Sequence, residues 1–201
     1  MMINTLNTTL RRIPAWPIYV IGAVWAAWLF YLGVTGGLGV EPINALEREY
    51  GEVGLKLLII GLAITPLRKY VGVNLLKFRR ALGVTTFFYI MAHFTVWAVL
   101  DVGTFARVWE EILKRPYVTV GMLGFVLMIP LAVTSNNLSL RKLGGATWRK
   151  LHKLTYPIAL LAAVHYLWLV KGFQLEPIVY LGVILGLLAL RIQKSRKMAV
   201  A

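Results

Sequence analysis

The chain has 201 residues, 59% of them hydrophobic, and its 22 lysines and arginines against 8 acids give a net charge of +14. Soluble domains are nearer to about 45–50% apolar, so the composition indicates a membrane protein and excludes an ordinary soluble enzyme. The chain has no cysteine, which excludes disulfides, iron–sulfur clusters and thiol chemistry.

Six long apolar segments follow one another along the chain, and each is a candidate transmembrane helix. They cover about residues 16–34, 53–67, 82–100, 118–134, 155–170 and 178–192. A helix needs roughly 17–25 apolar residues to cross a bilayer, so the second, fifth and sixth segments need flanking residues to reach across. We therefore predict an all-α fold, with one domain over residues 1–201 that forms an integral membrane bundle of six transmembrane helices.

The acids and most of the basic residues lie at opposite ends of these spans. All eight acids follow the first, third or fifth span: Glu41, Glu47, Glu49, Glu52, Asp101, Glu110, Glu111 and Glu176. Sixteen basic residues lie at the opposite ends of the spans: Arg11, Arg12, Arg68, Lys69, Lys77, Arg79, Arg80, Arg141, Lys142, Arg149, Lys150, Lys153, Arg191, Lys194, Arg196 and Lys197. The positive-inside rule then places the basic segments and both termini in the cytoplasm.

The distribution of the basic residues also indicates the role of the positive charge. It marks topology and favours contact with anionic membrane lipid. No recognition motif for nucleic acid accompanies it, so we expect no nucleic-acid partner.

Two of the segments that hold the acids have a predicted local structure. The first begins with Thr35-Gly36-Gly37, a loop signal, and we expect an acidic loop from there to Glu52. The second holds an amphipathic stretch over residues 105–113, which we expect to lie on the membrane surface.

The three histidines, His93, His152 and His165, are the candidate functional residues. Two of them fall inside predicted spans, and the third lies at the start of one. An ionisable side chain at membrane depth is costly and marks a functional site by default. Imidazole is also the commonest side-chain ligand for metals and a frequent axial ligand of haem iron.

His93 and His165 are predicted to lie at the same depth. His93 comes thirteen residues after Arg80, and His165 comes twelve after Lys153. At about 1.5 Å per residue, both imidazoles lie roughly 18–20 Å from the basic end, on spans that run in the same direction. This predicts a haem held between them as axial ligands. The alternative is a hydrogen bond between helices.

His152 is predicted to lie about 20 Å from His165 along the helix, close to the basic surface. We expect it to serve electron entry, as a ligand of a second haem or as part of a quinone or flavin site. The alternative is a solvated interfacial residue beside Lys150 and Lys153.

Several ordered motifs resemble one known family. They are LAITPLR at 62–68, RRALG at 79–83 before His93, KRPYVTVG at 114–121, PLAVTS at 130–135, and WRKLHKL at 148–154 before His165-Tyr166. Together they resemble the MsrQ (YedZ) family, the haem-binding membrane subunits of the bacterial periplasmic methionine-sulfoxide reductase system. This family lies within the ferric-reductase-like transmembrane superfamily.

The resemblance implies a role for the whole chain. It implies one or two b-type haems, for which His93, His165 and His152 are the candidate iron ligands, and an association with FMN. It also implies a multi-pass protein of the bacterial inner membrane that forms a heterodimer with a periplasmic molybdopterin-containing reductase. Electrons would pass from the quinone pool to that partner, which repairs oxidised methionines, so the chain would be a non-catalytic electron-transfer subunit.

No dinucleotide-binding fingerprint is present in the chain. We therefore expect its donor to be membrane quinol or a separate flavin carrier. Two other functions stay open, a self-sufficient quinol or ferric reductase and a histidine-dependent transporter or proton relay without haem.

Overall fold

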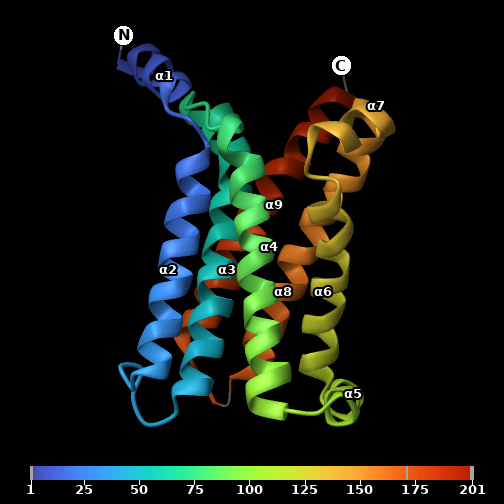
Figure 1. The fold of residues 1–201 in the computed structure, drawn as a ribbon. Helices are drawn as coiled ribbons and strands as arrows, with labels where there is room; N and C mark the ends of the chain where they lie inside the picture. Colours follow the sequence, from blue (N-terminus) through green and yellow to red (C-terminus); the bar gives the residue numbers. More distant parts are fainter. Residues whose placement is uncertain (1, 171, 200–201) are drawn as a thin grey trace.

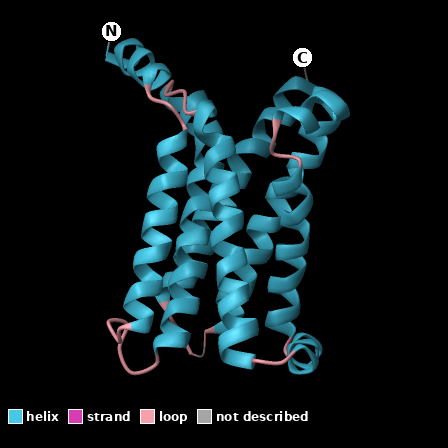
Figure 2. Ribbon diagram, viewed as in Figure 1, coloured by secondary structure: helices cyan, strands magenta, loops and turns pink. Residues whose placement is uncertain are grey.

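The computed structural model describes residues 2–170 and 172–199, with side chains described as far as Arg191. The described residues form helices and loops and no strands (Figure 2). The α-helices are α1 (Met2–Arg12), α2 (Trp16–Val34), α3 (Pro42–Pro66), α4 (Arg79–Thr95), α5 (Phe105–Lys114), α6 (Pro116–Val133), α7 (Asn137–Leu151), α8 (Thr155–Leu169) and α9 (Leu175–Ala199). A π-helical turn extends α3 over Leu67–Val71 and another extends α4 over Val96–Val102, while 3-10 turns precede α4 at Leu76–Phe78 and α8 at His152–Leu154.

Four helical stretches in the described part of the chain are long and apolar enough to cross a membrane. They are Trp16–Val34, Pro42–Val71, Leu76–Val102 and Pro116–Val133. Helix α8 has fifteen residues, and the side chains of α9 are described only to Arg191. The prediction of an all-helical membrane protein is thus confirmed at the level of several spans.

The structure corrects the expected acidic loop before the second span. Helix α3 begins at Pro42, and residues up to Glu52 belong to it. Leu46 and Tyr50, one turn apart, are buried against α2 and α4, and the Tyr50 hydroxyl donates to the Ala26 carbonyl oxygen at 2.8 Å. The other faces of this part of α3 carry charged residues, so its mean hydropathy is low and the sequence did not show that it is helical.

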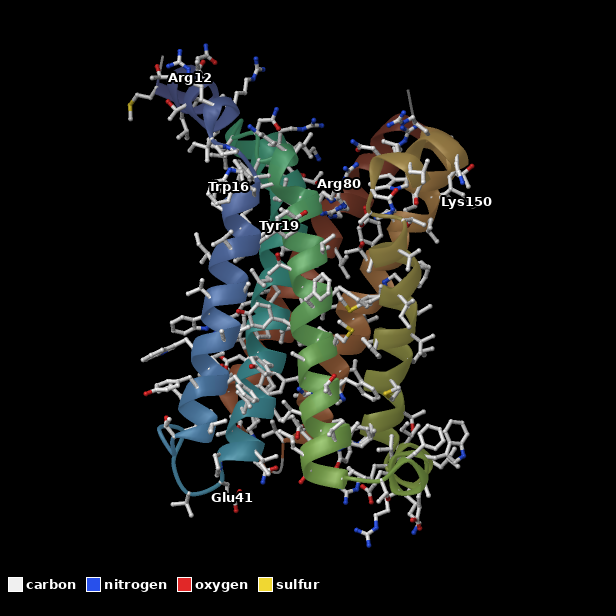
Figure 3. All side chains as sticks on the ribbon, in the orientation of Figure 1. Arg12, Trp16, Tyr19, Glu41, Arg80 and Lys150 are labelled. Atoms are coloured by element: carbon white, nitrogen blue, oxygen red, sulfur yellow. The ribbon has the colours of Figure 1, made fainter. Side chains whose placement is uncertain are left out.

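Two groups of helices make up the bundle (Figure 1). Helix α3 packs along α4, with α2 against both, and α8 packs along α6 and α9. Contacts of α3 with α8 and α9, and of α4 with α6, join the groups. Figure 3 places Arg12, Arg80 and Lys150 at one end of the bundle, the basic end, and Glu41 at the opposite, acidic end. The side chains of Lys194, Arg196 and Lys197 lie outside the described residues.

The predicted amphipathic stretch forms helix α5 across the acidic end. Phe105, Trp109 and Leu113 share one face of α5 and are exposed, whereas Val108 packs inward. This spacing of one turn between exposed apolar residues is the pattern expected of a helix lying on a membrane surface.

Candidate functional site

His93 on α4 and His165 on α8 face each other across the two groups of helices. Their ring centroids lie 6.3 Å apart, and the ring planes are inclined at 79°. The two residues are 72 positions apart in the chain, so this proximity is a product of the bundle. The prediction that the two imidazoles share one depth is confirmed.

Each imidazole is held by a backbone carbonyl of a neighbouring helix. Nδ1 of His93 lies 2.8 Å from the carbonyl oxygen of Glu47 on α3, and Nδ1 of His165 lies 2.7 Å from that of Tyr117 on α6. A carbonyl oxygen can only accept, so each Nδ1 carries the proton and donates it. Both Nε2 atoms then keep their lone pairs, which is the tautomer that binds a metal through Nε2.

A glycine lies one helical turn after each of these carbonyls. A β carbon on Gly51 would come within 3.0 Å of Nδ1 of His93, and one on Gly121 within 2.8 Å of Nδ1 of His165. Larger residues at these two positions would push the rings away from the carbonyls. The glycines therefore let each imidazole approach the backbone of the adjacent helix.

The two histidines border a cavity of about 850 Å³ between α3, α4, α6 and α8. Much of its wall is apolar, including Leu55, Leu58, Ile90, Phe94, Met122, Phe125, Met128 and Ile158. Charged residues line it toward the acidic end, among them Glu47, Arg48, Glu49, Glu52 and Glu176. The volume is within the range of about 300–1,000 Å³ usual for cofactor and ligand sites.

The residues of this cavity fit a haem. A metal bound about 2 Å from each of two imidazole nitrogens would separate the ring centroids by roughly 6 Å, close to the separation observed. No group of three or more His, Cys, Asp or Glu that could hold a bare metal ion occurs among the described residues. A haem needs only two axial ligands, because its own ring supplies the other four, and its flat apolar body suits the wall described above.

His152 lies apart from this pair, in the 3-10 turn before α8. Its ring stacks on Trp148, with the centroids 3.7 Å apart, and its Nε2 lies 3.2 Å from Oγ1 of Thr134. That hydroxyl already donates to the Pro130 carbonyl oxygen, so the histidine is the donor and Nδ1 keeps the lone pair. Burial, and then the nearby guanidinium groups of Arg79 and Arg80, lower the pKa of His152 to about 4.

Sequence reasoning missed the four residues that position the imidazoles. Glu47 and Tyr117 act through backbone atoms, which no side-chain motif reveals. Gly51 and Gly121 offered a weak signal, because a glycine inside a helix is unfavourable by about 1 kcal/mol relative to alanine and usually has a packing reason.

The known proteins that the chain resembles belong to one family. The family model described as "Ferric reductase like transmembrane component" matches residues 50–163. A protein of Agrobacterium fabrum named protein-methionine-sulfoxide reductase heme-binding subunit MsrQ is 44% identical over 178 residues, which cover 88% of this chain and 82% of that protein. Proteins of the same name from Brucella ovis and Brucella suis are 43% identical over 180 residues, covering 89% of this chain and 81% of theirs. No solved structure matches the chain.

Proposed function

Because the chain belongs to the MsrQ family of ferric-reductase-like transmembrane proteins, we propose that it is the haem-binding electron-transfer subunit of a methionine-sulfoxide reductase system. The observation that carries this function is the pair of imidazoles, His93 and His165, that face each other across an apolar cavity. The relatives are named as heme-binding subunits of protein-methionine-sulfoxide reductase, which supports the haem-binding part of this proposal.

In this proposal, Nε2 of His93 and Nε2 of His165 would bind the iron of one b-type haem. The carbonyl oxygens of Glu47 and Tyr117 accept hydrogen bonds from the Nδ1–H groups and make each imidazole a stronger ligand. When bound, the haem supplies one-electron redox chemistry. The apolar wall around the imidazoles excludes water and lowers the local dielectric, which tunes the reduction potential of such a site.

We infer the direction of electron flow from the different charges at the two ends of the bundle. We place the basic end in the cytoplasm of a bacterium, with both termini and six crossings of the inner membrane, by the positive-inside rule. Electrons enter from membrane quinol or a flavin carrier such as FMN, and His152 serves that entry as a ligand of a second haem or as part of the donor's site. The acceptor is a periplasmic molybdopterin-containing reductase that docks at the acidic end.

One experiment tests the function. The purified protein should show the visible spectrum of a bis-histidine b-type haem, and pyridine haemochrome analysis should give one or two haems per chain. The reduced protein should be reoxidised by the periplasmic reductase, and continued turnover should require methionine sulfoxide. A protein without haem would be a transporter or proton relay, and turnover without the partner would identify a self-sufficient reductase.

A further inference from the structure

Two arginines meet at one tyrosine near the basic end of the bundle. Nη1 of Arg191 on α9 donates to the hydroxyl of Tyr156 on α8 at 2.8 Å, and its Nη2 donates to the Leu62 carbonyl oxygen on α3 at 2.7 Å. The Arg191 guanidinium carbon also lies 4.9 Å from the centroid of the Tyr156 ring. Arg79, the first residue of α4, interacts with the same hydroxyl and repels Arg191. Four helices therefore converge on this cluster, which we call the arginine pair.

The arginine pair has no carboxylate partner. Every Asp and Glu of the chain lies toward the acidic end, and the ion pairs among the described residues are Lys56–Glu52, Lys114–Glu110 and Arg115–Glu111. The acceptors that Arg191 does have, a tyrosine hydroxyl and a backbone carbonyl, are uncharged. Its Nε is buried and has no hydrogen-bond partner among the described residues. Two close guanidinium groups in such surroundings are costly unless an anion neutralises them.

The depth of the arginine pair in the membrane indicates which anion can reach it. Arg191 comes sixteen residues after the start of α9 at the acidic end, which is about 24 Å along the helix. The hydrocarbon core of a bilayer is about 30 Å thick, so the guanidinium group comes close to the phosphates of the lipid leaflet at the basic end. Basic pockets between transmembrane helices bind anionic lipid head groups. The guanidinium fork also matches phosphate oxygens in a bidentate manner.

We propose that Arg191, Arg79 and Tyr156 form a site between helices for the phosphate group of an anionic phospholipid. The two guanidinium groups flank the phosphate and share its charge. The Tyr156 hydroxyl accepts a hydrogen bond from Arg191, so its own proton is free to be donated to a phosphate oxygen. A lipid held there ties α4, α8 and α9 together, and these helices carry or adjoin both cavity histidines.

The test measures lipid-dependent thermal stability of the purified haem-loaded protein in a neutral detergent. Phosphatidylglycerol should raise the melting temperature of the wild-type protein, and phosphatidylcholine should not, because a ligand that binds only the folded state stabilises it. Arg191→Gln should lose this shift, and Tyr156→Phe, which keeps the ring in place, should weaken it. Arg141→Gln, which removes one exposed charge of α7 at the same end, is the matched control and should keep the full shift.

Three results would overturn the proposal. The first is a full phosphatidylglycerol shift in both Arg191→Gln and Tyr156→Phe. The second is an equal shift with inorganic phosphate alone, which would assign the arginine pair to a soluble anion. The third is loss of haem from Arg191→Gln with the lipid shift unchanged, which would make the arginine pair part of a haem site. Failure of Arg191→Gln to fold leaves Tyr156→Phe to decide. The first two results leave the proposed electron-transfer function untouched.

Discussion

Gly121 lies so close to His165 that a β carbon on it would come within 2.8 Å of the imidazole Nδ1. Gly51 stands in the same relation to His93, at 3.0 Å. In each case the carbonyl oxygen one turn earlier in the glycine's helix accepts a hydrogen bond from the imidazole Nδ1. The two groups of helices thus hold their imidazoles by one repeated arrangement, in which a glycine makes room and a carbonyl sets the tautomer.

Gly51→Ala and Gly121→Ala should each lower haem retention while the helices stay folded. Overpacking a tight contact costs about 1–3 kcal/mol, which corresponds to a loss of roughly 5- to 150-fold in haem affinity. The measurement is the haem-to-protein ratio after purification, together with the far-ultraviolet circular dichroism spectrum. Gly61→Ala is the control on α3, because nothing lies within 4 Å of a β carbon there. Equal haem ratios in Gly51→Ala and Gly61→Ala would argue against the positioning role.

His93→Ala and His165→Ala should each remove the same haem population. The reason is that one iron needs both Nε2 atoms, so the loss of either ligand abolishes the same six-coordinate site. Pyridine haemochrome content and the reduced-minus-oxidised spectrum measure this directly. The pairing is wrong if both variants keep full haem content and an unchanged reduced spectrum.

His152→Ala should impair electron entry at the basic end. His152 lies at the basic end, about 20 Å from His165 along the helix. The expected outcome is therefore the loss of one haem equivalent or slower haem reduction at full haem content. Haem stoichiometry is measured together with the rates of reduction by quinol and by reduced flavin. Trp148→Phe is a useful companion, because it keeps an aromatic ring near His152 but loses the hydrogen bond from Nε1 to the Thr134 carbonyl oxygen.

The possible results for His152→Ala separate its roles. A missing haem equivalent supports ligation, and slow reduction with full haem supports a quinone or flavin site. If haem content and both rates match those of the wild-type protein, His152 is an interfacial residue with no part in electron entry.

Reporter fusions should find six crossings with the basic end in the cytoplasm. A carboxy-terminal fluorescent protein should fold and fluoresce, because both termini lie on the cytoplasmic side in this topology. Alkaline phosphatase joined after Gly103, in the acidic segment that follows the third predicted span, should be active. A carboxy-terminal reporter that is active only in the periplasm would reverse the orientation.

The sequence alone was enough to predict the features that depend on position along a helix. Apolar length indicated membrane-spanning helices, and the separation of charge indicated the two ends of the bundle. The shared depth of His93 and His165 followed from counting residues at a fixed rise of about 1.5 Å. Each of these is a one-dimensional property, so it can be read from the chain without knowing which helices are neighbours.

Only the tertiary structure decided how the helices are rotated against one another. The hydrogen bonds from each Nδ1 to a backbone carbonyl and the interaction of Arg79 with Arg191 join residues of different helices. A membrane-spanning helix is apolar on nearly every face, so its sequence has little periodicity to show which face meets a neighbour. Lipid stabilises every apolar face of a helix to the same extent. The face that meets a neighbour is therefore decided by close packing between helices that are distant in the chain.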